Sequence, residues 1–216
     1  MKPGEAWGEE LSGPPDLEVT GTDADLARLL GSARGALVRF RADSGSDFAR
    51  ALGISGSGDG GLAEAAIDGL QVDPGGYAVN GVVLGVPPGH LRAGTASRRI
   101  RVTVNGRELF SGPATTVVVA NGQFFDGLDV VPRGHPGDGR VEIQVYALRR
   151  GERRAMRARL PQGAHLPHPR ITTGTAKLVE IRVDGAPLAL SIDGVSHEPV
   201  TDLAVRVIPA ALRLVL

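Results

Sequence analysis

Four short stretches of the chain combine glycine with carboxylate or hydroxyl side chains, the residue types that handle phosphate and divalent cations. They lie at residues 20–25 (TGTDAD), 41–54 (RADSGSDFARALGI), 133–140 (RGHPGDGR) and 191–195 (SIDGV). Turns that lack Cβ atoms let backbone N–H groups approach phosphate oxygens, and carboxylate and carbonyl oxygens bind hard cations. Such stretches could therefore hold a phosphate group or a divalent cation.

Bulk composition excludes several other kinds of protein. The 216 residues include 24 Lys plus Arg and 24 Asp plus Glu, so the chain has no net charge to attract nucleic acid, and no nucleic-acid partner is predicted. The absence of cysteine excludes disulfides, thiolate catalysis and cysteine-ligated zinc. No apolar run is long enough to span a membrane and the N-terminus lacks a signal-peptide pattern, so we expect a cytoplasmic protein without a transmembrane segment.

The N-terminal third predicts a small α/β unit. Residues 1–16 are polar and rich in proline and glycine, which predicts a disordered lead-in. Residues 17–70 predict a strand, a helix capped by Thr22 or Asp23, and a second strand. A second helix is expected after Ser46, and a third, LAEAAIDGL, from residue 62.

Residues 71–216 have a different pattern, made of short runs of valine and isoleucine separated by turn residues. The pairs Asn105-Gly106 and Asp184-Gly185 predict hairpins, because both residue types tolerate positive φ. One helix is expected from about Gly151 to Leu160. The predicted fold class is therefore α+β and strand-rich, with a β-sandwich following the small α/β unit.

Four phrases in this order, SGSDFARALG, VVVANGQFFDGLDVVPRGHPGDGRVEIQVYAL, SIDGV and VIPAALRLVL, resemble the second half of the diacylglycerol kinase-like family. This family of ATP-dependent lipid kinases also includes sphingosine kinases. The resemblance covers about Ala36 to Leu216. It implies a nucleotide-binding α/β domain followed by a β-sandwich, with ATP and lipid meeting in the cleft between them. It also implies that the sandwich is whole here and the first domain is truncated.

The resemblance places a phosphate loop at residues 20–25, opposite the family's Gly-Gly-Asp-Gly-Thr. Gly21 and Asp23 agree with that loop and are the candidate cofactor-binding residues. Thr22 and Ala24 replace two of its glycines, and Asp25 replaces its threonine. The added Cβ atoms narrow the loop, and Asp25 brings negative charge to the phosphate position. An ordinary helix-capping turn is the favoured alternative.

The stretch 41–54 resembles the family's Leu-Pro-Leu-Gly-Thr-Gly-Asn-Asp-Phe-Ala-Arg, a second loop that contacts the nucleotide. Gly45 and Asp47 agree with it and Ser44 keeps a hydroxyl, which makes these three residues cofactor-binding candidates. Arg41 stands in place of the proline and Asp43 in place of the first glycine. The resemblance therefore favours a helix retained for packing over a loop that still binds ATP.

The remaining matches concern metal binding and the catalytic base. Asp138 matches a family loop that holds a structural Mg²⁺, so Asp138 and the main-chain oxygens of His135 and Arg140 form the candidate metal site, with a plain glycine-rich turn as the alternative. Asp193 is the catalytic candidate, because residues 193–195 match the family's Asp-Gly-Glu. Valine stands where the glutamate would accept the proton of the lipid hydroxyl, so that base is lost.

Other groups of residues have weaker functional interpretations. His197 and Glu198 could replace the missing base only after a displacement of several ångströms along a strand. His165 and His168 have the spacing of two metal ligands but no third, and residues 57–61 (SGDGG) imitate a phosphate loop without a preceding strand. A group of arginines on the predicted helix could meet anionic lipid headgroups, although a solvated surface is favoured: Arg149, Arg150, Arg153, Arg154, Arg157 and Arg159.

Three functional hypotheses follow. The first is a degenerate lipid kinase that no longer binds ATP productively and serves as a binding or assembly module. The second is an active lipid kinase, completed by a partner chain. The third is a protein that binds a lipid or another anionic small molecule. A truncated sheet exposes an edge and an apolar face, which predicts a homodimer or a partner protein at that surface.

Overall fold

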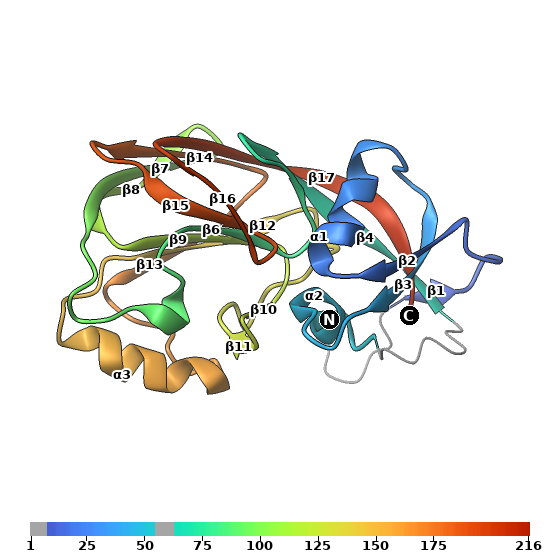
Figure 1. Ribbon diagram of the computed structural model, residues 1–216, viewed down its shortest axis with the longest axis horizontal. Coiled ribbons are helices and arrows are strands. Elements are labelled where there is room, and N and C mark those ends of the chain that lie inside the picture. The colour runs from blue at the N-terminus through green and yellow to red at the C-terminus, as the bar shows by residue number, and fades with distance from the viewer. Residues whose placement is uncertain (1–7, 55–62) are drawn as a thin grey trace.

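The structure is a computed structural model that describes residues 8–54 and 63–216, and its strands form two large sheets (Figure 1). The nine-stranded sheet comprises β1 (Glu9–Glu10), β2 (Leu17–Gly21), β3 (Leu37–Ala42), β4 (Ala63–Asp73), β5 (Gly76–Ala78), β7 (Arg98–Val104), β8 (Arg107–Ala114), β14 (Leu178–Asp184) and β17 (Asp202–Val215). The six-stranded sheet comprises β13 (Ile171–Ala176), β12 (Val141–Tyr146), β9 (Thr116–Ala120), β6 (Gly81–Gly85), β15 (Leu188–Ile192) and β16 (Val195–Val200).

The remaining elements lie around these sheets. A small hairpin is formed by β10 (Phe124–Phe125) and β11 (Leu128–Asp129). The helices are α1 (Asp23–Arg28), α2 (Asp47–Leu52) and α3 (Glu152–Arg159), with 3-10 turns at Leu29–Gly31, Pro88–His90 and Leu160–Gln162. None of the helices that the structure describes is long and apolar enough to cross a membrane.

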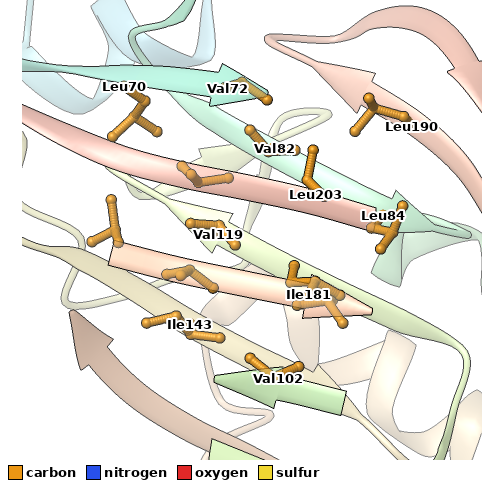
Figure 2. Packing of buried hydrophobic residues seen from close by; sticks show 14 of the residues in the cluster. Leu70, Val72, Val82, Leu84, Val102, Val119, Ile143, Ile181, Leu190 and Leu203 are labelled. Atoms are coloured by element: carbon orange, nitrogen blue, oxygen red, sulfur yellow. The ribbon is translucent and has the colours of Figure 1, made fainter. Parts of the chain in front are cut away.

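The main core lies between the two sheets, as the alternating pattern of the strands predicts (Figure 2). Val102 and Ile181 of the nine-stranded sheet and Val119 and Ile143 of the six-stranded sheet belong to this one buried cluster. Each such side chain contributes about 1.5–3 kcal/mol through its removal from water. The predicted fold class, strand-rich α+β with a β-sandwich, is confirmed.

Strands β4 and β17 join the sandwich to the small α/β unit, and Figure 1 shows both running from one part into the other. The first half of β17 pairs with β14, whereas Arg213 and Leu214 pair in parallel with β3. The change of partner follows an irregularity between Ile208 and Leu212, where Ala210 adopts a positive φ of 45°. Both strands are thus shared, and the division between residues 70 and 71 stays a prediction.

The expected helix from residue 62 is wrong, because residues 63–73 form β4. Alanine and glutamate favour a helix locally, but β4 pairs along its length with β17 and buries residues toward two clusters. Gly69 also leaves no room for a side chain, since an added Cβ would lie 2.7 Å from Leu30. Tertiary pairing therefore overrides local propensity here.

The α/β unit follows the prediction more closely. Thr22 is the N-cap of α1 and Ser46 the N-cap of α2, each accepting a backbone N–H through its side chain. Leu26 and Leu30 of the first helical segment pack with Phe40 of β3 and Phe48 of α2 in a second buried cluster. The apolar face of β3 is therefore covered, contrary to the expected exposed face.

Residues 8–16 contact the body of the protein, although the sequence predicts a disordered lead-in through residue 16; residues 1–7 lie outside the described part. Strand β1 pairs with β4, and the Ser12 hydroxyl donates to Glu64 at 2.7 Å. Glu64 also pairs with Arg213 at 2.9 Å. These contacts explain how a polar, glycine-rich segment is held in place.

One of the two predicted hairpins is confirmed. Asn105-Gly106 turns between the antiparallel strands β7 and β8 with positive φ at both residues. The prediction for Asp184-Gly185 is wrong, because the strands on either side of it belong to different sheets. Asp193-Gly194 forms a hairpin turn instead, between β15 and β16, with φ of 46° and 78°.

Asp68 of β4 offers a direct test of the irregularity in β17. Its side chain is 3 % exposed and accepts the N–H of Ala210 at 2.9 Å and that of Gly139 at 2.6 Å. We expect Asp68→Ala to lower the free energy of unfolding by about 2–4 kcal/mol, because two donors lose a charged acceptor. Urea denaturation measures the change. The matched control, Asp73→Ala at an exposed position of the same strand, should change it by less than about 0.5 kcal/mol, and equal losses would contradict the assignment.

Candidate functional site

A groove of about 330 Å³ lies between α1 and the β15–β16 hairpin, beside the turn that joins β4 to β5. Ala24 and Arg28 of α1 line one side, and Val195 and His197 of β16 line the other. The fold thus places the predicted phosphate loop and the predicted base position across one groove. The side chains that meet there are mostly small or apolar, and Val195 is 46 % exposed.

The predicted phosphate loop is closed by its own side chains. The carboxylate of Asp25 accepts the Thr22 N–H at 2.9 Å and the Thr22 hydroxyl at 2.7 Å, and the Asp25 N–H donates back to Thr22. This capping box lies against Gly21, where an added Cβ would be 2.4 Å from the Asp25 carboxylate. The bonds from Thr22 lower the pKa of Asp25, which is therefore negatively charged at neutral pH.

Asp23, the second matched residue of that loop, faces the next helix. It is 7 % exposed, contacts the Ser46 hydroxyl and accepts the Phe48 N–H at 3.1 Å. Burial raises the pKa of Asp23, while the bonds from Ser46 and Phe48 oppose that rise. The carboxylate therefore joins α1 to the first turn of α2. Asp23, which matches the phosphate loop of the family, thus has a structural role here.

The two halves of the second predicted loop differ in their contacts. Ser44 and Gly45 lie in an exposed turn, which the Ser46 N–H closes by donating to the Asp43 carbonyl at 3.0 Å. Asp47 accepts the Gly127 N–H at 3.0 Å, and Arg50 donates to the Gly127 carbonyl at 2.9 Å while its guanidinium lies 4.3 Å from the centre of the Phe124 ring. Burial raises the pKa of Asp47. These contacts attach α2 to the β10–β11 hairpin.

Asp193 has a structural role that the sequence did not reveal. Its carboxylate accepts three backbone N–H groups, from Val79 at 2.8 Å, Asn80 at 3.0 Å and Gly81 at 2.8 Å. Burial raises the pKa of Asp193 to about 7 and the charge of Asp23 adds to the rise, whereas the three donors oppose it. The hairpin turn thereby holds the segment that leads into β6.

A buried polar group beside Asp193 was missed by sequence reasoning. Asn80 and Asn121 are 3 % and 1 % exposed. Asn121 donates to the carbonyls of Asp68 and Val79 at 2.9 and 2.7 Å, and Asn80 donates to the Phe124 carbonyl at 2.9 Å. Both asparagines precede glycine beside a valine-rich strand, Asn80 before β6 and Asn121 after β9, a pattern that is typical of a plain turn.

The predicted metal loop is held by hydrogen bonds within the protein. Asp138 accepts the Arg140 N–H at 2.9 Å, and His135 accepts the Gly137 N–H at 3.2 Å through its ring. Among residues 8–54 and 63–216, no three His, Asp or Glu side chains form a group that could hold a metal. The predicted site also uses the main-chain oxygens of His135 and Arg140, so Mg²⁺ binding by this loop stays a prediction.

The two residues weighed as substitutes for the missing base lie on opposite faces of β16. His197 follows Val195 by two positions and lines the same groove, whereas Glu198 points away from it.

The other histidine pair does not converge on a metal. His165 is 1 % exposed with neither ring nitrogen hydrogen-bonded, and His168 accepts the Arg170 N–H at 3.1 Å. Residues 57–61 lie outside the described part of the chain.

The arginines of α3 do not share one solvent face. Arg154 and Arg159 are exposed, but Arg153 is 5 % exposed and donates to the carbonyls of Arg92, Ala93 and Thr95. The expected group of arginines is therefore divided between solvent and the body of the protein. The carbonyls of Arg92, Ala93 and Thr95 provide acceptors that the helical spacing alone could not reveal.

Comparison with known protein families decides the relationship that the motifs suggested. The profile of a family described as "YegS C-terminal NAD kinase beta sandwich-like domain" matches residues 92–216, more than half of the chain. The chain belongs to this family. The match confirms the resemblance to the diacylglycerol kinase-like family in its C-terminal sandwich, and it makes this chain a member of a kinase family. Comparison with curated proteins gave no match.

Solved structures resemble this chain over 93 % of its length. A diacylglycerol kinase from Bacillus anthracis str. Sterne matches with a TM-score of 0.74 and 18 % identity, over 93 % of this chain and 76 % of that one. A putative diacylglycerol kinase from the same organism gives 0.76 and 15 %, over 93 % and 78 %. Yeast NADH kinase complexed with NADH gives 0.53 and 13 %, over 93 % and 61 %. At these identities the likeness establishes the fold.

Asp193 leads to a prediction about pH. Its pKa in the folded protein, about 7, exceeds the ordinary value of 3.8, so its stabilising contribution is complete below about pH 4 and is lost as pH rises through about 7. Between about pH 5 and about pH 8 we expect the native protein to lose ~2 kcal/mol more than Asp193→Asn, after allowing for solvent screening. Urea unfolding at both pH values measures this difference. Equal losses would mean that the three N–H donors outweigh burial.

Proposed function

We propose that this kinase-family member is impaired in phosphoryl transfer and acts as a binding or assembly module. The observation that carries the proposal is the occupied phosphate loop. The Asp25 carboxylate takes the Thr22 N–H that a phosphate oxygen would need, and it lies over Gly21, the one glycine that the loop retains. ATP would have to displace a capping box worth about 1 kcal/mol and overcome a fixed negative charge.

The charge around the groove supports the same conclusion. Asp23 raises the pKa of Asp193, which places these two carboxyl groups within electrostatic range, and Asp25 is ionised. Arg28 is the basic residue that lines the groove, and it already pairs with Asp25. Little positive charge therefore remains for a triphosphate.

The base position supports impaired chemistry independently. Val195 accepts no proton, and Glu198 lies on the opposite face of β16, so His197 is the titratable side chain of this strand that lines the groove. It stands two residues from the base position, about 6.6 Å along the strand. The proposal gives Mg²⁺ no role, because the Asp138 loop keeps its shape through its own hydrogen bonds.

A phosphoryl-transfer assay tests this proposal. With radiolabelled ATP, Mg²⁺ and mixed lipids, we expect no label in lipid from the native protein, and no saturable ATP binding by calorimetry. The variant Asp25→Thr restores the family residue and should increase ATP binding, because it removes a charge of the same sign as the triphosphate. Asp184→Thr, which removes an exposed charge outside the groove, is the matched control. Label that appears in lipid and is lost in Asp193→Ala would establish the active-kinase alternative.

The assembly part of the proposal rests on β2. This strand pairs with β3 on one side, and no other described strand pairs with it. Its first residue, Leu17, is 38 % exposed, and a free edge beside an apolar side chain is suited to strand addition.

We expect a homodimer through this edge, measured by light scattering across a range of concentrations. Leu17→Lys should dissociate the dimer, because an edge lysine opposes strand addition. Val195→Lys is the matched control, since Val195 is the other exposed large hydrophobic residue of the described chain and lies on a different strand. A monomer at every concentration would contradict the proposal.

A further inference from the structure

A second groove, of about 350 Å³, lies at the end of the sandwich where α3 packs, and Figure 1 shows α3 at the opposite end of the molecule from α1 and α2. Four of its lining side chains are arginines: Arg149, Arg150, Arg153 and Arg170. Ser97 and Thr115 lie on its other wall. This groove is thus basic. It is also separate from the groove between α1 and the β15–β16 hairpin, which is the kinase-type groove.

Negative charge is almost absent from the chain around this groove. The segments 86–100, 111–118 and 146–171 contain ten arginines and one acidic residue, Glu152, although the whole chain is neutral. Both oxygens of Glu152 are already engaged, one with Arg170 at 3.3 Å and the other with a backbone N–H at 2.7 Å. The excess positive charge is therefore local and uncompensated.

Arg153 is fixed beneath the groove. Its side chain is 5 % exposed, and its Nη1 donates to the carbonyls of Arg92, Ala93 and Thr95 at 2.9, 3.1 and 2.7 Å. Its Nε lies 3.4 Å from the Leu148 carbonyl, and Nη2 has no bonding partner among the residues that the structure describes. A buried guanidinium with one donor nitrogen left over is prepared to bind an anion without further ordering.

Arg149 and Arg150 complete the arrangement at the rim. Both are exposed, and neither forms an ion pair with any carboxylate of residues 8–54 and 63–216. Burial and the nearby charge of Arg150 lower the pKa of Arg153, which indicates that the positive groups repel one another. An anion between them would relieve this repulsion.

We propose that this groove binds the phosphate group of a phosphomonoester, with Arg153 Nη2 at its base and Arg149 and Arg150 at its rim. Nη2 carries two N–H groups that can donate to phosphate oxygens, and the hydroxyl of Ser97, an exposed residue that lines the groove, supplies a further donor. Such a phosphate has two sources, a lipid headgroup such as that of phosphatidic acid, or a free small molecule such as glycerol 3-phosphate. The site does not depend on the state of the kinase-type groove.

Two binding measurements on the full chain distinguish the sources. Co-sedimentation with phosphatidylcholine vesicles, with and without phosphatidic acid, tests the lipid headgroup. Calorimetric titration with glycerol 3-phosphate or inorganic phosphate tests the free anion. The double variant Arg149→Gln/Arg150→Gln should weaken whichever binding occurs by about 30-fold, which corresponds to ~1 kcal/mol for each charge removed.

The matched control is Arg107→Gln/Arg206→Gln, which removes the same charge from two exposed arginines on the nine-stranded sheet, neither of which lines the groove. Thermal unfolding of both variants checks that the fold is intact. Saturable binding of either source that is lost in the first variant and kept in the control supports the site. No binding of either source, or an equal loss in both variants, overturns it. ATP does not enter these measurements, so their outcome is separate from that of the kinase assay.

Discussion

The pairing of β4 with β17 is the interaction on which the rest of the structure depends. These two strands are hydrogen-bonded from the sandwich to the α/β unit, and β17 exchanges β14 for β3 as its neighbour along the way. The exchange occurs at an irregularity that Asp68 holds by accepting the Ala210 N–H. Without that irregularity, β17 could not present its edge to β3 in parallel, and α1 and α2 would have no sheet to pack on.

Carboxylates bound to backbone N–H groups recur wherever two elements meet. Asp23 joins α1 to α2, Asp47 joins α2 to the β10–β11 hairpin, and Asp193 joins the β15–β16 turn to the start of β6. In each case the acceptor of the backbone N–H is a side chain of the protein itself. A residue that matches a kinase motif can therefore persist through its contribution to folding, because a charged acceptor of buried N–H groups is costly to remove.

The two grooves differ in the charge that they offer a ligand. The groove beside α1 is lined by one arginine, Arg28, which already pairs with Asp25, whereas four arginines line the groove beside α3. Although the chain has no net charge, its two grooves therefore differ in positive charge. If the α3 groove binds a phosphomonoester, the protein would recognise the chemical group that lipid kinases produce, at a surface separate from the groove beside α1.

The sequence by itself determined the local features, namely the strand-rich sandwich and the caps Thr22 and Ser46, because alternation and capping are properties of neighbouring residues. It also predicted which half of the second loop is kept for packing. The tertiary structure alone decided that residues 63–73 form β4 and that Asp193 accepts three N–H groups. Those outcomes depend on partners more than 100 residues away, which no local pattern specifies.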